Sequence, residues 1–571
     1  MGTVNSTLFG DRRTVCPSKV IQLKTGQVRG KTFLTPAQPN VDCYLGIPFG
    51  KPPVGILRFQ KPVPVDCWEG ILNCTEFGPR CFHKDEIFEL TPFSPLPPKS
   101  EDCLRLNVFV PSGDDFEEVD NRTGGRPVLV FIHGGGFSVH SASHYGDISI
   151  CSTLCRKEII VVTIQYRLGF FGFFTTNDEV APGNYGLYDQ ALALKWVNEN
   201  IAGFGGNPEN VTVCGHSAGG ASADLLSLSP ISRNYFQHVI PMGGNGSCKF
   251  AVNDAEEVQN ECLNFAEELG FQIYPNWTKI EQSEHLVEFM RTLSGQQLQL
   301  GLLGKKGHRI NKNKLHLTPV IDGEFLPKPI SDLRREAPRK NCMVGVTTYE
   351  GLLFACLTFT IAFPTITKIN HLIRRHLNIT RDNINPAMDE LTEKILSVYI
   401  DKAKQANSKE LSKALIRIMG DSIISYGQPL YAKEMSSLGH RVYFYSFDYD
   451  RSGRFGLINR FMPFTSSTHG TELPYLLGKG VIANFRPDDD DHKMIEIFTT
   501  IFANFCRFGN PNGKPEEEQK WETVSPENPY RYFSINLPES MMKNDFGNST
   551  SELWIDAYET VHSLEIQNRS Q

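Results

Sequence analysis

The stretch FGGNPENVTVCGHSAGG (204–220) joins a short apolar run to a glycine-rich turn. The run VTVC (211–214) is typical of a buried strand, and it leads directly into Gly-His-Ser-Ala-Gly (215–219). A serine on so tight a turn sits in strained backbone geometry, and its glycine neighbours avoid steric clashes. The small residues that follow favour a helix. The pattern therefore predicts a strand, a sharp turn that presents the hydroxyl of Ser217, and a helix.

Apolar, β-branched runs on both sides of this stretch predict strands that are covered on both faces. Helical patterns at 188–200 and 254–269 lie between them. The alternation predicts the α/β class, with a large, mostly parallel central sheet flanked by helices and carrying insertions. The expected strands are 128–133, 159–166, 211–214, 238–242, 342–346 and 442–447.

The composition excludes a disordered, collagen-like or coiled-coil protein. Of the 571 residues, 40% are hydrophobic and 21% are charged, which is typical of a globular chain. The 57 Lys and Arg against 64 Asp and Glu give a net charge of −7, so no nucleic-acid partner is expected.

No apolar run reaches the ~18 residues of a membrane span. No internal repeat or long linker divides the chain, which favours one large domain.

A second glycine-rich segment could supply the backbone N–H donors that a serine nucleophile needs. The expected strand 128–133 ends in His-Gly-Gly-Gly-Phe (133–137). Successive glycines let backbone N–H groups approach a substrate oxygen closely, as an oxyanion hole requires. By itself this segment also fits a flexible turn, and G-x-S-x-G matches are common by chance. Because both segments directly follow expected strands, a serine nucleophile beside N–H donors is favoured.

Further segments make the chain resemble the type-B carboxylesterases, a family of α/β-hydrolases that also contains the cholinesterases and neuroligins. The resemblance covers roughly residues 20–540 and implies the α/β-hydrolase fold. The implied domain is 20–545, with an N-terminal arm at 1–19 and a C-terminal tail at 546–571. The segments that carry it are YLGIPFGKPPVGILRF (44–59), SEDCLRLNVFVP (100–111), YRLGFFGFF (166–174), NYGLYDQALALKWVNENIAGFGGNP (184–208), TPVIDGEFLP (318–327), HGTELPYLLG (469–478) and FANFCRFGNPN (502–512).

The resemblance implies the remaining catalytic groups. The acid falls on Glu350 in GVTTYEG, where Tyr349 replaces the Asp that usually precedes this glutamate. The base falls on His469 in HGTELPY. The chain order of Ser217, Glu350 and His469 is the order of this fold. The oxyanion donors carry over to the N–H groups of Gly135, Gly136 and Ala218.

Two other histidines compete for a role near the nucleophile. His216 adjoins Ser217, and we interpret it as a residue that packs or shapes the pocket rather than as the base. His133 has a structural interpretation as well, with a contact to substrate as the alternative.

The resemblance implies a serine carboxylic ester hydrolase that forms an acyl-enzyme on Ser217. Its partner is a small-molecule ester, and it needs no cofactor and no metal. An acyltransferase with the same acyl-enzyme is an alternative, since it differs only in the acceptor. A non-catalytic, neuroligin-like interaction domain is less favoured, because such relatives typically lose the nucleophile. Choline esters are disfavoured, because segment 81–103 lacks a Trp for a cation–π contact and His216 stands where cholinesterases have Glu.

The family pattern also implies two disulfides, Cys81–Cys103 and Cys248–Cys262. In the cytosol both pairs would be reduced. Disulfide-ready cysteines and several N-x-S/T sequons favour the secretory pathway, reached by an unrecognised signal.

The N-terminus indicates a different location. Met1-Gly2-x-x-x-Ser6 fits the N-myristoylation pattern, which makes Gly2 a lipidation candidate. No apolar signal-peptide core follows it. The sequence therefore favours a cytoplasmic protein, which would associate peripherally with a membrane if Gly2 is lipidated; a chance match of the pattern is the alternative for Gly2, and the secretory pathway is the alternative location.

Overall fold

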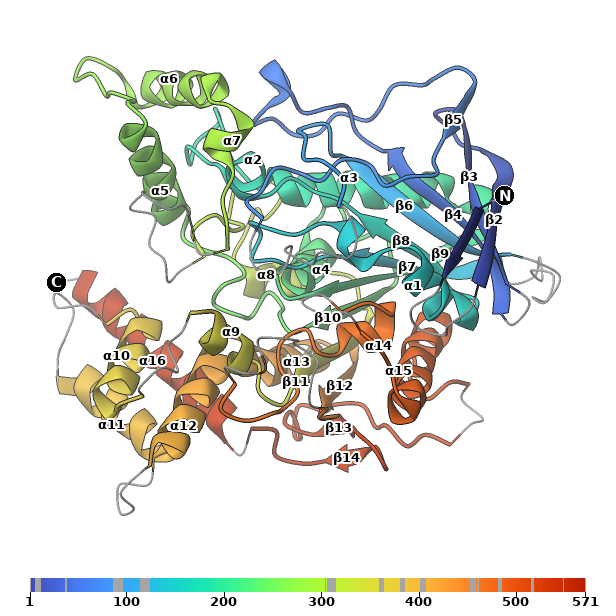
Figure 1. Cartoon of the computed structure of the whole chain (residues 1–571). Helices are drawn as coiled ribbons and strands as arrows, with labels where there is room; N and C mark the ends of the chain where they lie inside the picture. The colour runs from blue at the N-terminus through green and yellow to red at the C-terminus, as the bar shows by residue number, and fades with distance from the viewer. Residues whose placement is uncertain are drawn as a thin grey trace. The chain divides into compact units, whose positions relative to one another are not determined.

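The computed structural model describes most of the chain as two compact units (Figure 1). Unit 1 comprises residues 1–246, 250–342 and 473–518, and unit 2 comprises 247–249, 343–472 and 519–571. Each unit is therefore built from segments that are far apart in the sequence. The described residues are 2–5, 12–35, 38–85, 96–112, 124–302, 304, 315–358, 364–379, 386–400, 407–451, 459, 462–480, 485–514, 518–547 and 549–569.

Unit 1 contains a mixed sheet with the strand order β1-β2-β3-β4-β6-β8-β7-β9-β10, and β5 pairs with β3. The strands along the path from β1 to β8 pair antiparallel, and β8, β7, β9 and β10 pair parallel. A short connection is enough for an antiparallel pair, as between β2 and β3 and between β3 and β4, whereas a parallel pair needs a crossover segment. The strands are β1 Gly2–Asn5, β2 Arg12–Gln22, β3 Gln27–Thr35, β4 Gln38–Pro48, β5 Ile71–Asn73, β6 Arg105–Ser112, β7 Arg126–Ile132, β8 Ile160–Ile164, β9 Gly206–His216 and β10 His238–Met242.

Helices cover the parallel part of this sheet. Helices α3 and α4 pack against β9, and α15 contacts β7 and β9. Strand β8 is buried at every position, as expected for a strand that is covered on both faces. The helices of unit 1 are α1 Ile148–Cys151, α2 Gly169–Phe173, α3 Tyr185–Asn200, α4 Ala218–Leu228, α5 Ala255–Glu268, α6 Lys279–Thr292, α7 Gly295–Leu298, α8 Ile330–Glu336, α14 Leu473–Leu477 and α15 Asp489–Phe508.

Unit 2 places the strand order β11-β12-β13-β14 beside a group of helices. Strands β12 and β13 are parallel, whereas β13 and β14 are antiparallel. Helices α9 to α12 and α16 share an apolar core. The elements are β11 Asn341–Thr347, most of which lies in this unit, β12 Arg441–Phe447, β13 Tyr532–Ile535, β14 Met541–Lys543, α9 Gly351–Leu357, α10 Ile366–His376, α11 Pro386–Tyr399, α12 Ser408–Gly420, a π-helix at Asp421–Ser425, α13 Gly427–Ser437 and α16 Thr550–Arg569.

The predicted α/β class is confirmed, and every strand expected from the sequence is present. The expected strands coincide with β7, β8, β9, β10, β11 and β12, and the expected helices with α3 and α5. The antiparallel strands β1 to β4 extend the sheet beyond this parallel set. The segments set apart as arm and tail also carry regular structure. The arm contains β1, and the tail contains α16, whose buried Trp554 donates a hydrogen bond to the hydroxyl of Tyr399 (2.9 Å).

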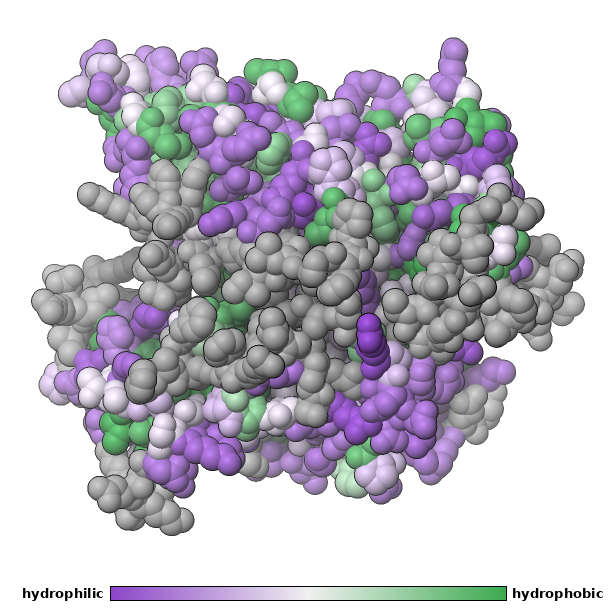
Figure 2. Space-filling model, in the orientation of Figure 1, coloured by the Kyte–Doolittle hydropathy of each residue, from purple (hydrophilic) through white to green (hydrophobic). Residues whose placement is uncertain are grey.

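The described surface is mostly hydrophilic in the view of Figure 2, with apolar residues in small, scattered groups. None of the described helices is both long enough and apolar enough to cross a membrane.

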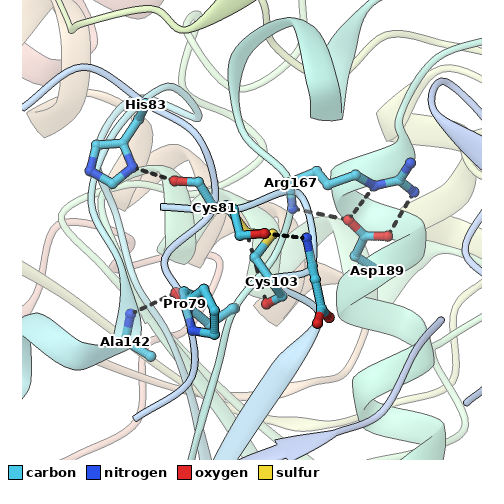
Figure 3. The surroundings of a disulfide bond; sticks show 10 residues. Pro79, Cys81, His83, Cys103, Ala142, Arg167 and Asp189 are labelled. Carbon is cyan, nitrogen blue, oxygen red and sulfur yellow. Dashed lines mark hydrogen bonds and ion pairs between the residues drawn. A yellow bond between two sulfur atoms is a disulfide. The ribbon is translucent and has the colours of Figure 1, made fainter. Parts of the chain in front are cut away.

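A buried ion pair ties the segment after β8 to helix α3 (Figure 3). The guanidinium of Arg167 donates from Nε and Nη2 to the two carboxylate oxygens of Asp189, each over 2.8 Å. The backbone N–H of Arg167 adds a third bond, to Oδ2 (3.0 Å). The two side chains are only 3% and 0% exposed, so loss of one partner leaves an uncompensated charge inside the protein.

We predict that Asp189→Ala lowers the free energy of unfolding by about 3–5 kcal/mol, because Arg167 remains buried without its counter-ion. Urea denaturation of both proteins measures the difference. Lys51→Ala is the matched control, since it removes the solvent-exposed pair Lys51–Asp66 (2.8 Å) and should cost at most about 1 kcal/mol. Equal losses in the two variants would contradict the prediction.

Candidate active site

Ser217 lies in a sharp turn between β9 and α4, as the sequence predicts. Its backbone has φ 60° and ψ −123°, a conformation that costs a non-glycine residue on the order of 1–3 kcal/mol. The N–H of Ser217 donates to the carbonyl of Met242 at the end of β10 (2.7 Å), which holds the turn against the neighbouring strand. The side chain is thereby presented at the carboxyl end of β9.

The glycines of the turn are required by close backbone packing. A Cβ added to Gly215 would lie 2.0 Å from the carbonyl oxygen of Gly219. A Cβ on Gly219 would lie 2.1 Å from the carbonyl oxygen of Ile132, the last residue of β7. No side chain fits at either position, so helix α4 can begin immediately after Ser217 and directly against β7.

The triple-glycine loop packs against the same turn. A Cβ on Gly134 would lie 2.5 Å from the carbonyl oxygen of His216 and 2.8 Å from Cβ of Ser217. Gly135 and Gly136 have φ 110° and 58°, conformations that favour glycine. The loop folds back on itself, because the carbonyl of Gly135 accepts hydrogen bonds from two N–H groups further along it (3.0 Å each).

Three N–H groups of this region meet the requirement for oxyanion donors. Among the described residues, no backbone carbonyl accepts a hydrogen bond from Gly135 or Gly136. Ala218 is the first residue of α4, where an N–H has no partner within the helix. A helix N-terminus also favours developing negative charge. The role of Gly135, Gly136 and Ala218 as oxyanion donors stays a prediction.

Buried histidines brace the glycine loop. His133 donates from Nδ1 to the carbonyl of Gly134 (2.8 Å), and its ring stacks on Tyr166 at 4.5 Å. These contacts agree with the structural interpretation of His133. His140 has φ 87°, and its ring stacks on His144 at 3.9 Å. Sequence reasoning missed His140 and His144, because only the fold stacks these two rings and places His140 beside His133 (5.8 Å between the rings). His216 is also buried.

In unit 2, the structure brings the predicted acid and base together. Nδ1 of His469 donates to Oε2 of Glu350 over 2.6 Å. Oε1 of Glu350 accepts from the N–H of Thr347, at the end of β11 (2.7 Å). The ring of Phe354 lies 4.8 Å from that of His469. Glu350 is 1% exposed, so both of its oxygens are held in a fixed direction by these bonds.

The segment before His469 is fastened to the turn that carries Glu350. The N–H of Tyr349 donates to the carbonyl of Ser467 (3.0 Å), and the hydroxyl of Thr468 accepts from the N–H of Leu353 (3.0 Å). The hydroxyl of Tyr349, the departure from the family pattern, accepts from Nη2 of Arg417 (3.0 Å). A tyrosine at this position thus ties the acid turn to helix α12.

A second buried carboxyl group, Glu472, belongs to the same region. Burial and then the charge of Glu350 raise the pKa of Glu472 well above its ordinary value, which favours its protonated, neutral form. Sequence reasoning missed this residue, although it lies within the HGTELPY motif. A neutral Glu472 adds no second negative charge beside the pair of Glu350 and His469.

The first implied disulfide is present. Cys81 and Cys103 are joined in unit 1, and the carbonyl of Cys81 accepts from Nδ1 of the buried His83 (2.8 Å; Figure 3).

The second implied disulfide, Cys248–Cys262, is contradicted, because both residues are buried thiols. Sγ of Cys248 donates to the carbonyl of Ile424 (3.7 Å) and accepts from Nε2 of Gln428 (3.8 Å), contacts that lie within unit 2. Cys262 lies on α5 in unit 1, where burial raises its pKa to about 12. The thiol of Cys248 therefore has hydrogen-bond partners in unit 2, and the thiol of Cys262 is buried on α5 in unit 1.

The lipidation candidate Gly2 begins β1, where it lies opposite Val15 of β2. Met1 and Ser6 of the myristoylation pattern lie outside the described residues. Lipidation of Gly2 stays a prediction. Among the described residues, no group of His, Cys, Asp and Glu could hold a metal ion.

Comparisons with known proteins identify the family. The carboxylesterase family matches residues 17–554. The chain is 40% identical to esterase cest-33 of Caenorhabditis elegans over 530 residues, which are 92% of each protein. It is 31% identical to the acetylcholinesterase of Bungarus fasciatus, over 91% of this chain and 84% of that protein. It is 29% identical to the medium-chain fatty acyl-CoA hydrolase precursor of Anas platyrhynchos, over 94% and 92%.

The chain therefore belongs to the carboxylesterase family. The resemblance and the α/β-hydrolase fold expected from the sequence are both confirmed. As a member of this family the chain is a carboxylesterase, a hydrolase that acts on ester bonds of small molecules.

We predict that Gly134→Ala reduces kcat/KM about 100-fold or more, because the new Cβ displaces the Ser217 turn. Hydrolysis of a short-chain aryl ester measures the loss, and the thermal midpoint reports whether the variant is folded. Gly203→Ala is the control, since its Cβ would lie 3.2 Å from the carbonyl oxygen of Gln22, and it should keep near-normal activity. A folded Gly134→Ala protein with full activity would show that the close contact is unimportant.

We predict that Glu472→Gln stabilises the protein at neutral and alkaline pH. The pKa of Glu472 is raised in the folded state, so the folded protein binds more protons than the unfolded chain above about pH 4.3. The native enzyme therefore loses stability as pH rises through this window, whereas the variant carries no ionising group there. Denaturation midpoints at several pH values should diverge as pH rises and converge near pH 4. A variant that is less stable at every pH would refute this assignment.

Proposed function

We propose that the chain hydrolyses carboxyl esters through an acyl-enzyme on Ser217, with His469 and Glu350 completing a Ser-His-Glu triad. The bond of 2.6 Å between His469 and the buried Glu350 carries this proposal. With Nδ1 engaged by the carboxylate, Nε2 is the atom that accepts the serine proton. The chain order of the three residues and the family support the same assignment.

In the first step His469 takes the proton of Ser217, and Oγ attacks the ester carbonyl. Glu350 keeps the imidazole in the required tautomer and stabilises the imidazolium. The tetrahedral oxyanion accepts hydrogen bonds from the N–H groups of Gly135, Gly136 and Ala218. In well-studied hydrolases, loss of one such donor costs about 2.7–4 kcal/mol of transition-state stabilisation.

In the second step His469 returns its proton to the leaving alcohol, and the acyl group remains on Ser217. Water then attacks the acyl carbon while His469 takes its proton, the bond from that carbon to Oγ of Ser217 breaks, and His469 returns the proton to Oγ as the carboxylic acid leaves. The raised pKa of Glu472 favours its neutral form, in which it adds no second negative charge beside Glu350 and His469.

We predict that Ser217→Ala lowers kcat for an aryl ester by about four orders of magnitude or more and abolishes labelling by a fluorophosphonate. Peptide mass spectrometry of the labelled wild-type protein should find the adduct on Ser217. Ser222→Ala is the matched control, because Ser222 lies on helix α4 just after the Ser217 turn and its hydroxyl accepts a hydrogen bond from Nε2 of Gln190 (3.1 Å). This variant should still be labelled on Ser217. An adduct on another serine, or full turnover by Ser217→Ala, would refute the proposal.

A further inference from the structure

Two cysteines outside the active site lie in direct contact inside unit 1. The sulfur atoms of Cys43 and Cys151 are 3.4 Å apart, although the residues are 108 positions apart in the sequence. Cys43 belongs to strand β4 and Cys151 ends helix α1. The side chains are 0% and 1% exposed. A disulfide bond requires the sulfurs to approach to about 2.05 Å, so the remaining movement is small.

The elements on both sides hold the two sulfurs in place. In the sheet, Cys43 lies opposite Lys31 of β3 and opposite Phe109 of β6. Lys31 in turn forms an ion pair with Asp147 (2.8 Å). Asp147 caps helix α1 by accepting the N–H of Ile148 (2.8 Å). The ion pair therefore fastens the start of α1 to the strand beside β4 and keeps Cys151 against Cys43.

The neighbours of Cys43 and Cys151 include a third thiol and no metal-binding group among the described residues. A third thiol, Cys155, donates to the carbonyl of Phe109 (3.9 Å). Among the described residues these cysteines are not part of any group that could hold a metal ion. Burial raises the pKa of the Cys43 thiol well above its ordinary value, and its hydrogen bond with Cys151 raises it further. Burial therefore favours the thiol form of Cys43 over its thiolate.

We propose that Cys43 and Cys151 form a second disulfide when the protein meets a peroxide. One sulfur attacks a peroxide oxygen, the O–O bond breaks, and a sulfenic acid and one water result from hydrogen peroxide. The other sulfur attacks the sulfenic sulfur, the S–O bond breaks, and a second water leaves. The two thiols lose two electrons to the peroxide, and both thiol protons end in water.

The new bond has a structural consequence that differs from that of Cys81–Cys103. The existing disulfide closes a separation of 22 residues, whereas the new one closes 108. A cross-link over a longer loop restricts the unfolded chain more strongly. It would also join β4 to the helix that follows the glycine loop. We therefore expect oxidation to raise the thermal midpoint of the protein by several degrees.

The test uses the full chain, treated with hydrogen peroxide or left untreated. After denaturation the remaining thiols are alkylated, and the protein is digested without reduction and analysed by mass spectrometry. We expect a cross-linked peptide pair that contains Cys43 and Cys151 only after treatment. Cys67 is exposed and serves as an internal measure of oxidation. Oxidised Cys67 together with alkylated Cys43 and Cys151 would refute the proposal.

Two variants make the assignment specific. Cys151→Ser should abolish both the cross-link and the rise in thermal midpoint, and it should leave Cys43 able to react with dimedone as a sulfenic acid. Cys155→Ser is the matched control, and it should retain the Cys43–Cys151 cross-link. A bridge that contains Cys155 instead, or sulfonic acids without any bridge, would also overturn the proposal.

Discussion

The sharp turn at Ser217 depends on a backbone contact that excludes side chains. Gly134, Gly215 and Gly219 each approach another backbone segment so closely that an added Cβ would lie 2.0–2.5 Å from a carbonyl oxygen. This packing lets α4 start directly after Ser217 and forces the serine into φ 60°. The strain is retained because the bond from Ser217 to Met242 and the surrounding strands determine the path of the chain. The fixed position of Ser217 and of the glycine loop beside it follows from the same contact.

In unit 2, hydrogen bonds fix the positions of Glu350 and His469, whereas in unit 1 close backbone packing fixes the Ser217 turn. Glu350 is held by Thr347 and His469, and the segment that carries His469 is fastened to the Glu350 turn through Ser467 and Thr468. Two neighbouring carboxylates are costly where both are buried, and the raised pKa of Glu472 favours the form of this group that carries no charge. The charge around Glu350 and His469 therefore depends on Glu472 as well.

Much of the fold was predictable, because each expected strand is a continuous apolar run between polar segments. Ser217 and the glycine loop were predictable as well, since their chemistry is local to short stretches of sequence. The structure pairs Glu350 with His469, as the family resemblance implies. The antiparallel addition of β1 to β4, the imidazole stack around His140 and the neutral Glu472 were not predicted. Each of these arises from contacts between segments that carry no common local pattern.

The cysteines show most clearly the difference between what local sequence patterns predict and what contacts between distant segments decide. Family spacing led to Cys81–Cys103, which the structure contains, and to Cys248–Cys262, which it does not. No spacing pointed to Cys43 and Cys151, yet their sulfurs touch. By itself, the sequence determined the strand, the sharp turn with its serine and the glycine loop, because steric limits on neighbouring residues act along the chain. Only the tertiary structure decided which distant side chains meet and which carboxyl groups stay neutral, because burial and contact depend on how the strands and helices pack.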